Sequence, residues 1–111
     1  MTFKEELAQK AYEARTNIDV SENIKRVKDK LLDSYLSREF TISLIMAKTT
    51  MAIGGYRSNY VSFFIPNHLD PNLYKQVFIS ALKELGFTDD DISISYNNHK
   101  SYDEYLIKLI W

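Results

Sequence analysis

The chain has 111 residues, a formal net charge of −1 and no cysteine, with 45% hydrophobic and 26% charged residues. These values are typical of one soluble domain covering residues 1–111, and they exclude a disulfide framework and a thiolate metal site. No apolar run approaches the roughly 18 residues of a membrane-spanning helix, and no signal peptide is recognisable, so we expect a cytoplasmic protein that does not enter a membrane.

Residues 1–37 are predicted to be helical. Thr2 and Glu5 have the spacing of a capping box, which predicts the start of a first helix. A second helix is predicted by an apolar stripe that consists of Val20, Ile24, Val27, Leu31 and Tyr35. The two helices have apolar stripes that are out of phase. Because Asn and Thr are poor helix formers, we favour a break near Thr16–Asn17 over one long helix with two apolar faces.

The second stripe has two interpretations. Its two and a half heptads are too few to require a coiled coil, so a helix that lies on a sheet is the simpler one. The alternative is self-association of the chain, which would use Val20, Ile24, Val27 and Leu31.

The remaining segment, residues 38–111, begins with two predicted strands. Alternation of apolar and polar residues predicts a strand over 40–46. The run 60–65 is almost continuously apolar, which predicts a central strand covered on both faces. Between them, Gly54-Gly55 permits a hairpin, so we expect these two strands to pair antiparallel.

A third helix is predicted over 71–85. Asp70 supplies an N-cap carboxylate, and Pro71 occupies the first helical position, where its missing N–H costs nothing. Gly86 follows the last turn as a left-handed residue that ends the helix.

Two further strands complete the chain. Alternating runs over 92–96 and 102–111 predict a hairpin with 97–101 as its loop. The element order is therefore ααββαββ, which predicts an α+β fold with the helices packed on one antiparallel sheet.

Catalytic motifs are missing from the sequence. There is no cysteine nucleophile and no G-x-S-x-G elbow, and His68 and His99 both fall in predicted loops. The triplet Asp89–Asp91 lacks the ligand alternation and the glycine of a calcium loop. His99 with Asp103 and Glu104 is a single histidine without a partner motif. We therefore expect a non-enzymatic protein without a metal or a cofactor.

Tyrosine-rich segments are the main indication of binding. The chain has eight tyrosines, and residues 95–102 mix Tyr, Ser and Asn as recognition surfaces do. In the segment 54–57, glycines would let a ligand approach the backbone, and arginine pairs with anionic groups. The alternative is that tyrosine simply favours strands and that 54–57 is a plain turn. The candidate partner-binding residues are Tyr56, Arg57, Tyr60, Tyr96, Asn98, His99 and Tyr102.

The leading hypothesis is a small protein that binds a macromolecule, above all another protein. A residue usage rich in Ile, Lys, Asn, Ser and Tyr indicates an AT-rich genome, such as that of a phage or another mobile element, and an inhibitor or accessory factor is one such protein. The alternative is a nucleic-acid-binding accessory protein that uses the basic N-terminal helical region and the Gly54–Arg57 turn. Its candidate contacts are Arg15, Lys25, Arg26, Lys28, Lys30 and Lys48.

Overall fold

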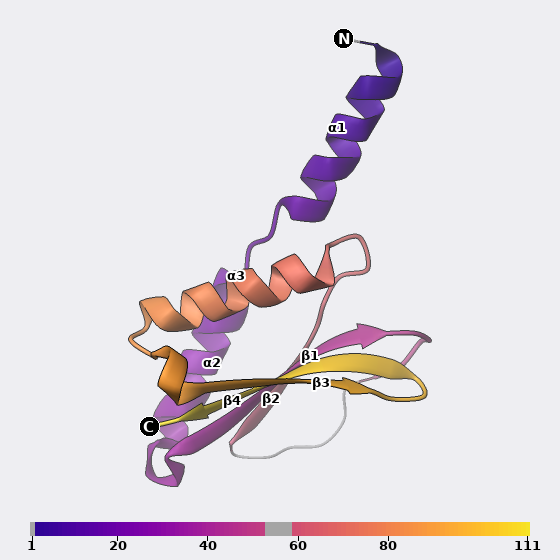
Figure 1. Ribbon diagram of the computed structural model, residues 1–111. Coiled ribbons are helices and arrows are strands. Elements are labelled where there is room, and N and C mark those ends of the chain that lie inside the picture. Colours follow the sequence, from indigo (N-terminus) through magenta and orange to yellow (C-terminus); the bar gives the residue numbers. More distant parts are fainter. Residues whose placement is uncertain (1, 53–58) are drawn as a thin grey trace.

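The structure, a computed structural model, describes residues 2–52 and 59–111. It confirms the α+β fold, with helices α1 and α2 ahead of the strand pair β1 and β2, helix α3, and the strand pair β3 and β4. Helices α2 and α3 lie on one face of a four-stranded sheet, and α1 extends away from it (Figure 1). In chain order the elements are α1 (Phe3–Thr16), α2 (Ser21–Asp33), the 3-10 turn η1 (Tyr35–Ser37), β1 (Glu39–Ala47), β2 (Tyr60–Phe64), α3 (Pro71–Glu84), the 3-10 turn η2 (Asp89–Asp91), β3 (Ile92–Asn98) and β4 (Tyr102–Ile110).

The sheet is mixed, with strand order β2-β1-β4-β3. Strand β4 pairs antiparallel with both β1 and β3, but β1 pairs parallel with β2, from Thr41 opposite Tyr60 to Ile45 opposite Phe64. The predicted hairpin of β1 and β2, and with it the wholly antiparallel sheet, is therefore wrong. A parallel pair requires the chain to return across the length of the sheet, which a tight turn cannot do. The Gly54-Gly55 pair itself lies outside the described residues.

Strand β2 lies at an edge of the sheet, so the prediction of a central strand at 60–65 is also wrong. Val61 and Phe63 are buried under the helices, whereas Phe64 on the opposite face is exposed. Strand β1 lies inside the sheet and is buried on both faces at its centre, because Leu44 and Ile45 are both buried although they point to opposite faces. An apolar run thus identified a strand but not its place in the sheet.

Helix α3 forms as predicted and covers the sheet. The Asp70 carboxylate accepts hydrogen bonds from the backbone N–H groups of Asn72 (3.0 Å) and Leu73 (3.2 Å), and Gly86 follows the helix with a φ of 108°. The core between the helices and the sheet consists of Val20, Ile24, Val27, Phe40, Ile42, Leu44, Val61, Phe63, Ile65, Leu69, Tyr74, Phe78, Leu82, Ile107 and Leu109.

The helical N-terminal region divides at the predicted break. Helix α1 ends at Thr16, and α2 begins at Ser21, whose backbone N–H (2.9 Å) and hydroxyl (2.6 Å) both donate to the Asp19 carboxylate. The stripe on α2 faces the sheet, so the helix-on-sheet interpretation is confirmed. Val20, Ile24, Val27 and Leu31 use much of their surface within their own chain, where they pack in or against the core, and self-association through them stays a prediction.

Helix α1 projects from the compact body as an arm. None of its side chains is buried. It is held near its C-terminal end, where the Arg15 carbonyl accepts from the Asp70 N–H (3.1 Å) and the Arg15 guanidinium lies 3.8 Å from the Asp70 carboxylate. The radius of gyration is consequently 15.8 Å, against about 13 Å for a compact domain of this length.

Candidate functional site

Glu104 organises a polar cluster at the hairpin end of the sheet. The side chain is only 7% exposed. Its Oε2 accepts a hydrogen bond from the Ser43 hydroxyl (2.5 Å), and its Oε1 lies 3.3 Å from Asn97 Nδ2 and 2.9 Å from His99 Nε2. Strand register creates this arrangement, because Asn97 lies directly opposite Glu104 on β3 and Ser43 is a diagonal neighbour on β1.

The cluster holds its carboxylate in the ionised form. Burial by itself raises the pKa of Glu104, because it removes water from the charged state. Hydrogen bonds from Ser43, His99 and Asn97, together with the charge of His99, lower the pKa by more, so that it lies below its ordinary value. The Ser43 hydroxyl donates to a carboxylate, not to an imidazole, and it is fully buried. This geometry does not activate a nucleophile; it fixes the hairpin to β1.

Further contacts make the turn end of the β3–β4 hairpin rigid; residues 96–103 are called the hairpin tip. Lys48, just after β1, donates to the His99 carbonyl (2.9 Å), and its Nζ lies 3.1 Å from Asp103 Oδ1. Asp103 Oδ1 is buried and has no hydrogen-bond partner among the described residues. Its ion pair with Lys48 offsets the free-energy cost of burying its charge. The His99 ring stacks on Tyr102 with centroids 4.3 Å apart. The tip is therefore a preformed surface, which loses little conformational freedom on binding.

Four of the seven predicted partner-binding residues meet at this tip, but on two faces of the sheet. Tyr96 and Asn98 share the face that carries the helices, because they lie opposite Tyr105 and Asp103 on β4. His99, bonded to Glu104, and Tyr102 belong to the other face. Tyr60 does not join them, because it begins β2 at the opposite end of the sheet. Tyr56 and Arg57 lie outside the described residues.

The six basic residues predicted to contact nucleic acid do not form one surface. Lys25 and Lys28 line a groove beside α3. Arg26 lies on the other flank of α2, with its guanidinium over an aromatic ring of β2. Arg15 and Lys48 form ion pairs at two further places, and Lys30 donates to the carbonyl of Tyr60 (3.4 Å). Ion pairs partly neutralise Arg15 and Lys48, and nucleic-acid contact through the six residues stays a prediction.

Sequence reasoning missed the outer edge of β3. In the part of the chain that the structure describes, no strand pairs with this edge, since β3 ends the sheet. The strand ISISYNN has neither a charge nor a proline, the two devices that most often protect an edge from pairing with another chain. Ile94 (47% exposed) and Tyr96 (54% exposed) stand beside it. The alternation of 92–96 revealed a strand, but no local signal shows that a strand is at an edge.

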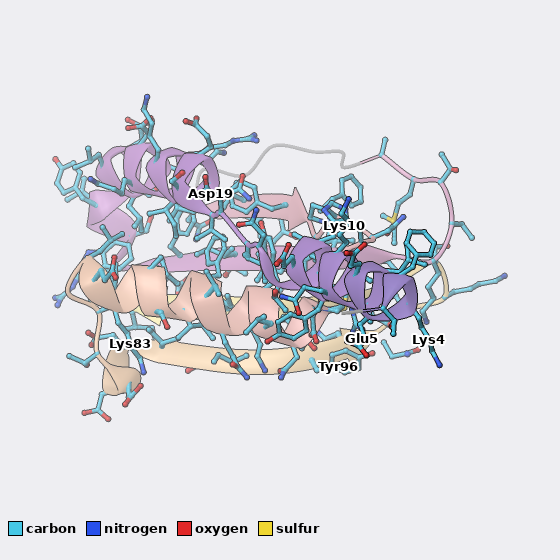
Figure 2. The ribbon with its side chains drawn as sticks, turned by 90° about the horizontal axis from the view of Figure 1, so that it is seen from above. Lys4, Glu5, Lys10, Asp19, Lys83 and Tyr96 are labelled. Carbon is cyan, nitrogen blue, oxygen red and sulfur yellow. The ribbon has the colours of Figure 1, made fainter. Side chains whose placement is uncertain are left out.

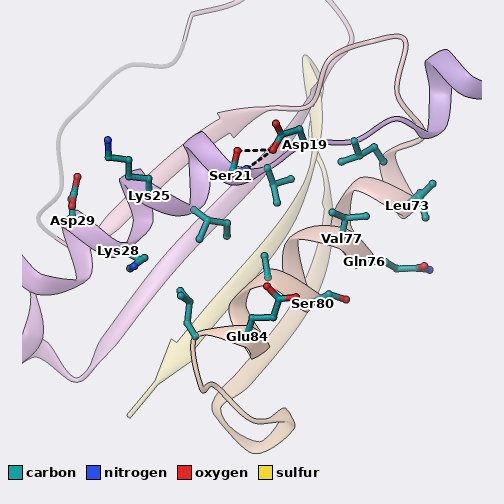
Figure 3. Close-up of a pocket in the computed structure, with 15 residues that line it drawn as sticks. Asp19, Ser21, Lys25, Lys28, Asp29, Leu73, Gln76, Val77, Ser80 and Glu84 are labelled. Atoms are coloured by element: carbon teal, nitrogen blue, oxygen red, sulfur yellow. Dashed lines mark hydrogen bonds between the residues drawn. The ribbon is translucent and has the colours of Figure 1, made fainter.

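A groove also separates α2 from α3 (Figure 3). Its volume is about 970 Å³, and it continues at Lys28 and Leu85 into a second hollow of about 360 Å³ near the C-terminus. The two together are called the helix groove. Its apolar lining consists of Ile18, Val20, Ile24, Leu31, Leu32, Tyr35, Leu73, Val77, Ala81, Leu85, Phe87 and Trp111.

The described ranges, 2–52 and 59–111, were compared with the geometry of a metal site and of a membrane-spanning helix. No group of three or more Asp, Glu or His side chains within them is placed to hold a metal ion. The acidic triplet forms η2, where the Asp91 carboxylate accepts from the Thr88 N–H (2.9 Å) and Asp89 pairs with Lys83 (2.6 Å). No helix in those ranges has both the length and the apolarity to cross a membrane.

Comparison with known proteins found no matching family model, no similar curated protein and no similar solved structure. The β3 edge, the hairpin tip and the helix groove are therefore the features of the molecule that indicate a function.

Proposed function

We propose that the protein is a non-enzymatic binding protein whose partner is another protein, and that the partner docks as an additional strand along β3. The observation that carries this proposal is the uncharged edge of β3, with which no described strand pairs, next to exposed Ile94 and Tyr96. Every second residue of an edge strand directs its N–H and C=O away from the sheet, so an extended peptide can pair with it through main-chain hydrogen bonds.

The surroundings of β3 favour an extended segment with an apolar side chain on one face. On the helix face, Ile94 and Tyr96 offer apolar contact, and Tyr96 is braced by the Tyr105 ring at 5.6 Å. On the opposite face, Ser93 and Ser95 are small and polar. No charged side chain of β3 needs to lose its water when a strand is added, which removes a large cost of docking.

The biological role that we propose is that of a cytoplasmic inhibitor or accessory factor of a phage or another mobile element. The absence of cysteine is consistent with a reducing compartment. A compact scaffold with a rigid recognition edge needs no catalytic residues to act in this way, because it blocks or recruits its partner by occupancy.

The test compares two isoleucine replacements of matched exposure. Ile94→Lys places a charge at the β3 edge, and Ile110→Lys places the same charge on β4, where the side chain is 50% exposed but not at an edge. We expect affinity capture from the host cytoplasm with the unaltered protein to retain a saturable protein partner. Binding should be lost, by at least tenfold in Kd, with Ile94→Lys and kept with Ile110→Lys.

Two results would contradict the proposal. One is that no saturable protein partner is captured at all. The other is that Ile94→Lys and Ile110→Lys bind the partner equally well, which would move the interface away from β3.

A further inference from the structure

Helix α1 has an apolar stripe that residues 2–52 and 59–111 of its own chain leave exposed. Phe3, Leu7, Ala11 and Ala14 fall on one side of the helix by their three- and four-residue spacing. Phe3 is 74% and Leu7 53% exposed, and Figure 2 shows Lys4 and Glu5 at the free end of the helix. Helices shorter than about 12–15 residues are marginal in water without packing. At 14 residues, α1 needs a surface to cover its stripe.

The helix groove is a surface of matching size and character. Helix α1 has 14 residues and α2 has 13, so both are about 20 Å long at a rise of 1.5 Å per residue. The lining of the groove is largely apolar, and Leu32 (73% exposed) and Trp111 line its far end. Large exposed apolar side chains gathered in one hollow indicate a docking surface.

The charges at the rims also suit α1. The α2 side carries Lys25 and Lys28 together with Asp19 and Asp29, and Glu84 stands on the α3 rim. An occupant must therefore present both signs of charge beside its apolar stripe. Helix α1 does so, because its helical period places Glu6, Glu13 and Lys10 on one flank of the stripe and Lys4 and Arg15 on the other.

The helix cannot fill the groove of its own chain without breaking contacts. The backbone hydrogen bond and the ion pair between Arg15 and Asp70 direct α1 away from the body. The short connection that follows is also held, by Ile18 on the core and by Asp19 on Ser21. A second copy can supply α1 with all of these contacts intact. We propose that α1 of one copy docks in the helix groove of another copy, so that the protein self-associates by arm exchange.

This contact differs from the β3 edge and does not depend on it. Reciprocal exchange closes a dimer, and one-way insertion builds a chain of copies; both raise the mass above that of the 13.0 kDa monomer. We expect sedimentation or light scattering of the full chain to show a concentration-dependent mass of at least twice this value.

Two pairs of lysine replacements test the arm and the groove. Leu7→Lys disrupts the stripe, and Gln9→Lys places the same charge on the opposite side of α1. Leu32→Lys disrupts the groove, and Leu36→Lys changes an exposed leucine that does not line it. We expect Leu7→Lys and Leu32→Lys to weaken association at least tenfold and the two controls to leave it unchanged.

Complementation makes the test specific. The Leu7→Lys chain keeps an intact groove and the Leu32→Lys chain keeps an intact arm, so mixing the two should restore one contact per pair and raise the mass again.

Circular dichroism should show that both variants remain folded, because both replaced side chains are exposed. The proposal is overturned if the unaltered chain stays at 13.0 kDa up to millimolar concentration, if Leu7→Lys associates normally, or if Ile94→Lys abolishes association instead.

Discussion

At the scale of single residues, Glu104 shows how much of a site depends on distant partners. In the sequence, Glu104 and Asp103 follow His99, and together these residues indicate at most an incomplete metal site. In the structure its strongest partner is Ser43, which lies 61 positions away in the chain. No spacing rule connects two such residues, because they meet only through the register of β1 and β4. The resulting cluster stabilises the hairpin tip.

The lowered pKa of Glu104 predicts an acid-sensitive contribution to stability. Because the folded chain binds this proton less tightly than the unfolded chain, the contribution is complete above the unfolded pKa, about 4.3, and is lost as the pH falls through the lower folded pKa. We expect Glu104→Gln to reduce the free energy of unfolding by about 1–3 kcal/mol at pH 7. The difference should shrink toward pH 3. Urea unfolding of both proteins across this range measures it.

The control is Glu84→Gln, which removes an exposed carboxylate of α3. It should change the free energy of unfolding little at any pH, because exposed charges interact weakly. A Glu104→Gln deficit that is constant or grows as the pH falls would contradict the proposed role of the ionised carboxylate.

At the scale of elements, local signals predicted the helices well. The Thr2 hydroxyl accepts from the Glu5 N–H (3.2 Å), Asp70 caps α3, and Gly86 adopts the left-handed conformation expected of it. These signals act over three or four residues, so sequence alone contains them. No such short-range signal tells where a strand lies in the sheet. The apolar run of β2 therefore predicts a central strand although β2 lies at an edge, and the sequence does not reveal the open edge of β3.

The Asp70 cap offers a prediction at this scale. Asp70→Ala removes the acceptor for the Asn72 and Leu73 N–H groups, so we expect the free energy of unfolding to fall by about 1 kcal/mol. Asp70→Asn keeps a capping oxygen and should retain most of that stability. Asp90→Ala, an exposed acid of η2 that is not an N-cap, serves as the charge-matched control. Equal losses for Asp70→Ala and Asp70→Asn in thermal or urea unfolding would show that charge, not capping, is what matters.

At the scale of the whole molecule, the structure combines a compact body with an exposed arm. The body is stabilised by a core shared between β1, β4, α2 and α3. The arm contributes no buried side chain to it. Regions with few buried contacts open locally at low cost in free energy, so the two parts should differ widely in stability.

Hydrogen exchange should reveal this difference. In dilute solution we expect the amides of α1 to exchange with little protection, while those around Phe78 in α3 remain protected up to the free energy of global unfolding. At high concentration the α1 amides should become protected if arms dock in grooves, while those of α3 change little. Strong protection of α1 in a dilute monomer would show instead that the arm packs on its own chain.

The sequence by itself determined the type and order of the elements, because caps, turns and hydrophobic alternation act between residues close in the chain. It also indicated the tyrosine-rich hairpin tip, of which Tyr96, Asn98, His99 and Tyr102 do come together. Only the tertiary structure decided that β1 and β2 are parallel, that β3 is an open edge, that Glu104 bonds Ser43, and that α1 is uncovered. Each of these depends on contacts between residues tens of positions apart. The free energy of such contacts cannot be inferred from a pattern of residues that are close in the chain.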